Sequence, residues 1–260
     1  MPDVEPAPLA RRETPEPSSR PPDAPPGIID YDGELVGPRP DRARRRFIAF
    51  EILAVVCLAV VPDVWHAIIS LRRPQGAFLF TNDMSIAILV RSFAVTLPVI
   101  ALIRYSHEPH AKFGLVRPRL AQLVAGGLAI AGVAHLLWFL SSTTIFVHLL
   151  GERHTYAAPT RPWSVALFVV AQAANAIAEE LVMRSYLIPR FEDLTRHAGA
   201  SIVGSTILFA SYHAWQGPSG IVSAVLFGLI AGIVFRITRS IGPVIAGHFV
   251  ANLLAFYAYR

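Results

Sequence analysis

The chain has 260 residues, of which 53% are hydrophobic and only 16% are charged, and its mean hydropathy is +0.48. A soluble domain of this length rarely carries so much apolar mass, so the composition excludes an ordinary soluble protein and predicts a polytopic helical membrane protein. The formal net charge of +5 comes from basic residues at the ends of the apolar runs, which is typical of cytoplasmic loops and argues against nucleic-acid binding.

The N-terminal 46 residues differ in composition from the rest of the chain. They contain eleven Pro, nine Asp or Glu and eight Arg, with almost no apolar clustering. Such a segment cannot bury enough surface to offset the entropy lost on ordering. We therefore expect residues 1–46 to be a disordered, Pro-rich cytoplasmic tail, with no cleavable signal peptide and a transmembrane domain over residues 47–260. The tail could also bind a partner.

Seven apolar segments follow this tail and predict an all-α transmembrane helical bundle. The segment 64–82 is amphipathic and is expected to lie at the interface, and if it re-enters the membrane the bundle has eight spans. The fifth predicted span is short and is followed by the helix-breaking sequence 216–220. The single cysteine, Cys57, lies in an apolar run, so no internal disulfide can form. The predicted spans are 47–61, 84–103, 120–147, 163–187, 201–215, 221–237 and 241–259.

The distribution of Arg and Lys predicts the orientation of these spans. With the N-terminus in the cytoplasm, the cytoplasmic flanks carry twelve basic residues and the outer flanks five. Cytoplasmic loops are enriched in Lys and Arg, so we expect an integral protein of the cell (plasma) membrane with a cytoplasmic N-terminus. Arg91, inside the second span, is expected to pair with Glu51 of the first span or to extend to the interface.

The fourth span carries two adjacent carboxylates and a guanidinium. A charge at the centre of a bilayer costs roughly 2.5–3.5 kcal/mol, so such residues usually face the interior of a bundle and have a function. Glu180 and Arg184 are four residues apart and can pair on one face of a helix. Glu179 points about 100° away from Glu180 and shares its face with Gln172 and Asn175. The two carboxylates are therefore expected to have different roles.

Two later segments carry polar residues with the same four-residue spacing. Phe209 and His213 lie on the fifth span, and His248 and Asn252 lie on the seventh. At a rise of about 1.5 Å per residue, Glu179, His213 and His248 are each roughly 14–18 Å from the nearest cytoplasmic flank. A shared site requires a common depth of this kind. His135 and His148 are expected to be packed residues without a catalytic role.

The three motifs Glu179-Glu180-x-x-x-Arg184, Phe209-x-x-x-His213 and His248-x-x-x-Asn252 resemble the CPBP family of intramembrane endopeptidases. This family includes the type II CAAX prenyl proteases and the bacterial Abi-like proteins. The order, spacing and membrane context of the motifs match over about residues 163–256. Each motif alone is weak, but three in order within apolar segments are a strong signal.

The resemblance implies an intramembrane glutamate endopeptidase that needs no metal or other cofactor. Glu179 would activate a water molecule, and His213 would orient that water or share its proton. His248 and Asn252 would stabilise the oxyanion at the scissile carbonyl. Glu180 and Arg184 would form a supporting pair, with Arg184 also available to bind substrate, and Phe209 would pack near the site. The expected substrate is a peptide or the C-terminal region of a membrane-anchored protein.

Two alternatives remain open from the sequence. Glu179, Glu180, His213 and His248 are plausible ligand types for Zn²⁺, although the two adjacent carboxylates point in different directions and no His-Glu-x-x-His motif is present. The protein could also be a non-catalytic membrane factor, such as an immunity or scaffold protein or a small transporter, because intramembrane Glu, Arg and His also suit proton relays.

Overall fold

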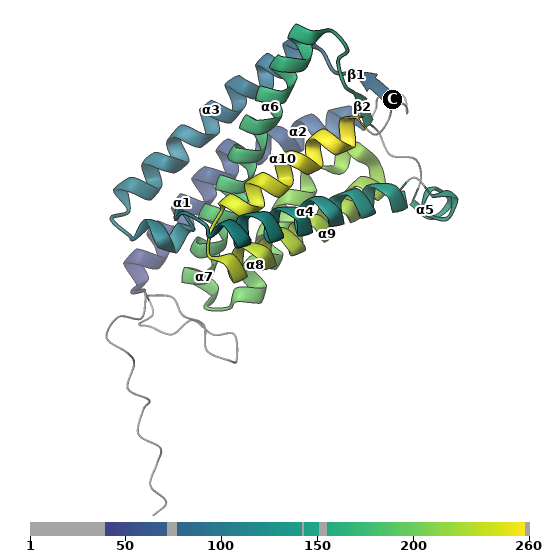
Figure 1. Cartoon of the computed structure of the whole chain (residues 1–260). Coiled ribbons are helices and arrows are strands. Elements are labelled where there is room, and N and C mark those ends of the chain that lie inside the picture. Colours follow the sequence, from purple (N-terminus) through teal and green to yellow (C-terminus); the bar gives the residue numbers. More distant parts are fainter. Residues whose placement is uncertain (1–39, 72–76, 142, 151–154, 258–260) are drawn as a thin grey trace, which may run out of the picture.

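A computed structural model of the chain describes residues 40–71, 77–141, 143–150 and 155–257. These residues form a bundle of helices with a two-stranded parallel sheet of three residues per strand at one end (Figure 1). The predicted tail, residues 1–46, lies largely outside the described residues. The helices are α1 (Arg42–Ala59), α2 (Val61–Ser70), α3 (Asn82–Tyr105), η1 (His110–Phe113), α4 (Leu120–Ser141), α5 (Thr144–Leu150), α6 (Pro162–Glu180), η2 (Leu181–Leu187), α7 (Ile188–Thr195), α8 (Ala198–Ser211), η3 (Ala214–Gln216), α9 (Gly217–Thr238) and α10 (Gly242–Tyr257), and the strands are β1 (Ala77–Leu79) and β2 (Thr155–Ala157).

Five helical stretches in the described part of the chain are long and apolar enough to cross a membrane. They are Arg42–Ser70, Asn82–Tyr105, Leu120–Leu140, Pro162–Thr195 and Ala214–Thr238, and two shorter apolar helices accompany them at Ala198–Ser211 and Gly242–Phe256. These seven stretches correspond to the seven predicted segments. The prediction of an all-α helical membrane bundle is therefore confirmed.

The first predicted span is longer in the structure than in the sequence analysis. We expected it to end near Val61, before Pro62 and Asp63, but α2 continues the helical path to Ser70. Pro62 lies in the first turn of α2, where proline is tolerated because the amide N–H of that position has no partner inside the helix. Part of the segment expected at the interface is thus an extension of the first span.

The charged residues of the first two spans pair differently from the prediction. Arg91 binds Asp63, and its guanidinium also donates to the backbone carbonyl of Ala59. Glu51 is instead buried against Arg190, with 3.3 Å between its Oε2 and the arginine Nε. The prediction of an Arg91–Glu51 pair was wrong because Arg91 lies in the first half of α3, which is level with the far end of the antiparallel first span.

The fourth span also continues beyond its predicted end at Leu187. After α6, the helix widens into the π-helical turns of η2 and then resumes as α7, with Pro189 in the first turn of α7. π-Helical turns are rare and are frequent at functional sites. Here they follow Glu179 and Glu180 directly and carry Arg184.

Arg190 of α7 is fully buried. Its guanidinium pairs with Glu51 and with Glu108, whose Oε2 lies 2.7 Å from Nη1. Burial alone would raise the pKa of Glu108, but the charges of Lys112 and Arg190 outweigh burial and hold that pKa below its usual range. This ion network joins α1, α7 and the segment between α3 and α4.

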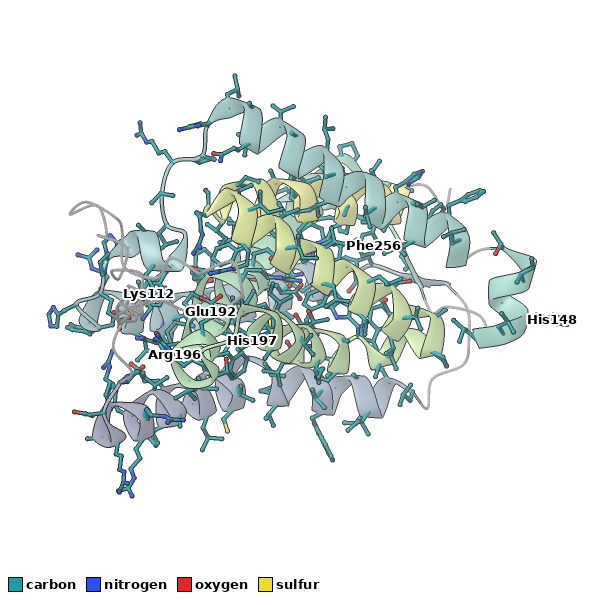
Figure 2. The ribbon with its side chains drawn as sticks, turned by 90° about the horizontal axis from the view of Figure 1, so that it is seen from below. Lys112, His148, Glu192, Arg196, His197 and Phe256 are labelled. Carbon is teal, nitrogen blue, oxygen red and sulfur yellow. The ribbon has the colours of Figure 1, made fainter. Side chains whose placement is uncertain are left out.

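The ion network around Arg190 and the two-stranded sheet lie at opposite ends of the bundle. Lys112, Glu192, Arg196 and His197 lie toward one end, whereas Phe256 and His148 lie toward the other (Figure 2). Phe80 follows β1 and donates its backbone N–H to Ala157 of β2, so the sheet is at the end where α3 begins.

Helices α4 and α10 run side by side at close range (Figure 1). A Cβ atom built on Gly247 would lie 2.6 Å from the Cβ of Ile130 and 2.8 Å from the carbonyl oxygen of Gly127. The first half of α4 is rich in Gly and Ala, whose small side chains allow two helices to approach closely. This packing fixes the position of α10 at Gly247, the residue directly before His248.

We predict that Gly247→Ala destabilises the protein, because the added methyl group must displace backbone atoms of α4. Overpacking of this kind typically costs about 1–3 kcal/mol. The matched control is Gly132→Ala, also on α4, where nothing lies within 4 Å of the added Cβ, so its stability should hold or rise. Thermal unfolding in detergent measures both, and equal midpoints for the two variants would contradict the close α4–α10 contact.

Candidate functional site

His248 lies between the two adjacent carboxylates of the fourth span. Its Nδ1 is 2.6 Å from Oε1 of Glu180, and its Nε2 is 3.6 Å from Oε2 of Glu179. All three side chains are at least nine-tenths buried, with exposed fractions of 4% for His248, 9% for Glu179 and 0% for Glu180. The imidazole of α10 therefore contacts both carboxylates of α6, one through each ring nitrogen.

Glu180 forms the predicted pair with Arg184. The same Oε1 atom that contacts His248 accepts a 2.7 Å hydrogen bond from Nη1 of Arg184. An ionised carboxylate can only accept, so the Nδ1 of His248 carries the proton in its bond to Glu180. The Arg184 guanidinium lies over the ring of Phe209, 4.5 Å from the centroid, and it is only 1% exposed. This burial favours a supporting role for Arg184 over direct contact with a substrate.

His213 lies just beyond the end of α8, with its ring next to that of Phe209. The Nδ1 of His213 is 2.8 Å from the backbone carbonyl of Phe209. A carbonyl oxygen can only accept, so Nδ1 is the donor, and in a neutral imidazole the other nitrogen, Nε2, is then an acceptor. The geometry therefore gives His213 a nitrogen that can accept a hydrogen bond from water.

A cavity of about 480 Å³, called here the main cavity, brings the predicted catalytic residues together. Its lining includes Glu179 of α6, His213, and His248 and Asn252 of α10. Gln172 and Asn175 line the same cavity, as their shared helical face with Glu179 predicted. Glu180 and Arg184 lie behind this wall and line neither of the two cavities described here.

The main cavity also contains residues that the sequence analysis did not assign to the site. Asp63, His66 and Arg91 line it, as does Phe80 beside β1, so the cavity extends toward the sheet end of the bundle. The charges of Asp63 and Arg91 were visible in the sequence, but their pairing depends on how α2 and α3 align.

Tyr212 and Trp215 flank His213 and were expected to shape its pocket. Both line the main cavity. Tyr212 is 5% exposed, and its buried hydroxyl has no hydrogen-bond partner in the described part of the chain.

A second, smaller cavity of about 160 Å³ adjoins the same residues. It lies among α4, α9 and α10, and its lining shares His213, His248 and Asn252 with the main cavity. Phe209 and Phe227 form part of its wall, and the ring of Phe227 lies 4.9 Å from that of His248. The imidazoles of His213 and His248 therefore stand between the two cavities.

The described residues contain no group of three or more His, Cys, Asp or Glu side chains arranged to hold a metal ion. The oxygen of Glu180 nearest His248 already accepts hydrogen bonds from both Arg184 and His248.

Comparison with known proteins agrees with the motifs. Residues 161–254 match the family described as Type II CAAX prenyl endopeptidase Rce1-like, and this range includes the three motifs from Glu179 to Asn252. The predicted resemblance to the CPBP/CAAX protease family is confirmed for this part of the chain. No curated protein and no solved structure matches the chain significantly.

We predict that Glu180→Ala destabilises the protein far more than Glu179→Ala. Removing Glu180 leaves the guanidinium of Arg184 buried without its carboxylate, and breaking a buried ion pair typically costs about 3–5 kcal/mol. Glu179 faces a cavity, so its removal should cost less than about 1 kcal/mol. Unfolding of both variants in detergent measures the difference in stability. Equal losses of stability would show that Glu180 has no greater structural role than Glu179.

Proposed function

We propose that this protein, whose residues 161–254 match the type II CAAX prenyl endopeptidase family, is an intramembrane endopeptidase with Glu179 as its general base. The observation that carries the proposal is the convergence of Glu179, His213, His248 and Asn252 on one cavity. These residues come from α6, from the turn after α8 and from α10, and the cavity offers space for water and a peptide inside a largely apolar bundle.

The first step is the activation of water. Glu179 takes a proton from a water molecule that also donates a hydrogen bond to Nε2 of His213. The resulting hydroxide attacks the scissile carbonyl carbon and forms a tetrahedral intermediate. When the C–N bond breaks, the leaving nitrogen takes the proton from Glu179, so the products are an amine and a carboxylic acid, which then releases its own proton to water. Positioned acid–base groups of this kind contribute about 10²–10⁴-fold to rate.

The oxyanion of the intermediate is stabilised by Asn252 and His248. Asn252 donates from its amide, and His248 donates from Nε2 while Nδ1 remains bound to Glu180. An imidazole that donates from both nitrogens is positively charged. Donors aimed at developing charge often supply the largest electrostatic contribution to catalysis.

The proposed substrate is a peptide, or the C-terminal region of a protein, that is anchored in the same membrane. The position of the cavity within apolar helices supports this substrate class, because a soluble folded domain cannot enter the bundle. The proposed location is the cell membrane, with the N-terminus in the cytoplasm, supported by the basic residues at the start of α1 and around Lys112 and Arg239.

We predict that Glu179→Gln lowers the hydrolysis rate at least about 100-fold, because the amide keeps the size of the side chain but cannot take a proton from water. The assay is cleavage of a membrane-peptide library by purified protein, with products identified by mass spectrometry. Gln172→Ala is the matched control on the same helical face and should retain most of the activity. Undiminished cleavage by Glu179→Gln would exclude the proposed base.

The same assay separates the metal-dependent alternative from the proposal. Activity should persist in EDTA, whereas loss of activity in EDTA and its recovery with Zn²⁺ would favour a zinc enzyme. If the wild-type protein cleaves no peptide but its gene still confers a phenotype, the non-catalytic scaffold alternative is favoured instead.

We also predict the orientation of the chain. In a Cys57→Ala background, the variant Asp83→Cys, at the start of α3, should react with a membrane-impermeant maleimide in intact cells. The variant His110→Cys, in η1, should react only after the cells are lysed. Since both side chains are exposed in the structure, the reverse labelling pattern would place the N-terminus outside the cytoplasm.

A further inference from the structure

The main cavity reaches the surface of the molecule between α2 and α3. His66 of α2 and Ala87 of α3 line this cavity, and both residues are exposed. At about 1.5 Å per residue, His66 lies roughly 6 Å before the end of α2, and Ala87 lies roughly 8 Å after the start of α3. Because β1 lies between these two helices in the chain, the opening of the cavity is near the sheet end of the bundle.

Polar groups continue from this opening to the proposed general base. Asp63 and Arg91 form an ion pair in the wall of the cavity, further from the sheet end than His66 and Ala87. Gln172 and Asn175 line the cavity on the same helix as Glu179. Charged side chains within membrane-spanning helices usually pair with one another or face water-filled cavities. The lining therefore provides a polar path from the sheet end to the site.

The site is closed toward the basic end, which is the end of the bundle around Arg190 and Lys112. The ten residues after Glu180, residues 181–190, are all buried, and Ser185 and Arg190 are 0% exposed. The hydroxyl of Ser185 donates to the backbone carbonyl of Phe113, so the segment after α3 packs directly against this stretch. None of these ten residues lines the main cavity or the smaller one. Water and peptide therefore reach Glu179 from the sheet end.

The basic end carries nearly all of the exposed positive charge in the described part of the chain. Eight Arg or Lys side chains are exposed in those ranges, and only Arg161, at the start of α6, lies toward the sheet end. The other seven are Arg42, Arg45 and Arg46 at the start of α1, Arg104 at the end of α3, Arg117 and Arg119 before α4, and Arg239 after α9. Enrichment in Arg and Lys is typical of the cytoplasmic side of a membrane protein. With the basic end in the cytoplasm, the cavity opens on the outer side.

We propose that the site acts on peptide segments presented from the outer side of the membrane. Its substrates are exported peptides, or the parts of membrane-anchored proteins that lie outside the cytoplasm. This inference rests on the proposed endopeptidase function and on the proposed cytoplasmic N-terminus. A segment that enters beside His66 passes the pair of Asp63 and Arg91 before it reaches Glu179. A peptide confined to the cytoplasm has no such path, because residues 181–190 fill the space between Glu179 and the basic end.

The first test measures from which side the main cavity is reached. In a Cys57→Ala background, the variant Asn175→Cys is treated with a small membrane-impermeant thiol reagent in right-side-out and in inside-out membrane vesicles. Labelling should be at least tenfold faster in the right-side-out vesicles. The matched control is Ser185→Cys, ten residues further along the same helical path, which should react in neither preparation because its side chain is fully buried.

Two outcomes of this labelling would overturn the proposal. One is faster labelling of Asn175→Cys in the inside-out vesicles. The other is labelling of Ala87→Cys, at the opening, from the outer side without any labelling of Asn175→Cys, because the opening would then not lead to the site.

The second test measures cleavage from each side. A charged, membrane-impermeant peptide that the purified protein cleaves is added to the same two vesicle preparations, which contain equal amounts of protein. Vesicles with Glu179→Gln give the background. Cleavage should be at least tenfold faster in the right-side-out vesicles, and detergent should make the two rates equal. Faster cleavage in the inside-out vesicles would overturn the proposal.

The labelling test separates failure of this inference from failure of the proposed function. If the purified protein cleaves no peptide but Asn175→Cys reacts from the outer side, the function fails and the outer opening stands. If peptides are cleaved only from the cytoplasmic side, the function stands and this inference fails. Reversed labelling of Asp83→Cys and His110→Cys would turn the opening toward the cytoplasm and would also overturn the inference.

Discussion

The buried carboxylate of Glu180 is the interaction on which the rest of the site depends. One oxygen accepts hydrogen bonds from Arg184, four residues along the same helix, and from His248 of α10. A carboxylate in an apolar interior is tolerated only when it is paired and hydrogen-bonded. Meeting that requirement fixes the orientation of the imidazole, with Nδ1 as the donor to Glu180, and turns its second nitrogen toward Glu179. The buried ion pair of Glu180 and Arg184 therefore positions the imidazole of His248 for its proposed part in catalysis.

The two ends of the bundle use charge in different ways. At the basic end, Arg190 is fully buried among the carboxylates of Glu51 and Glu108, and this network joins α1, α7 and the segment after α3. Toward the sheet end, polar and charged groups line a cavity, and among them Asp63 and Arg91 form an ion pair. The tightly paired end provides rigidity, and the cavity provides the space that a hydrolytic reaction needs for water and peptide.

The sequence predicted the contacts between residues of one helix. It missed the contacts between residues of different helices, which depend on how the helices align. The shared face of Gln172, Asn175 and Glu179 follows from helical periodicity, as does the pairing of Glu180 with Arg184. The contact between His248 and Glu180 joins residues 68 positions apart, and no local pattern contains it. The same limit explains the wrong partner for Arg91. The continuation past Leu187 was missed because proline is tolerated in the first turn of a helix.

The central claim is tested most directly by measuring whether Nδ1 of His248 carries a proton, because the site depends on the hydrogen bond from this nitrogen to Glu180. In protein labelled with ¹⁵N-histidine, with the His248 signals assigned by their loss in His248→Gln, the side-chain nitrogen shifts report which ring nitrogen carries a proton. The account predicts a protonated Nδ1 in a strong hydrogen bond that changes in Glu180→Gln. An unprotonated Nδ1, or signals unaffected by Glu180→Gln, would contradict it.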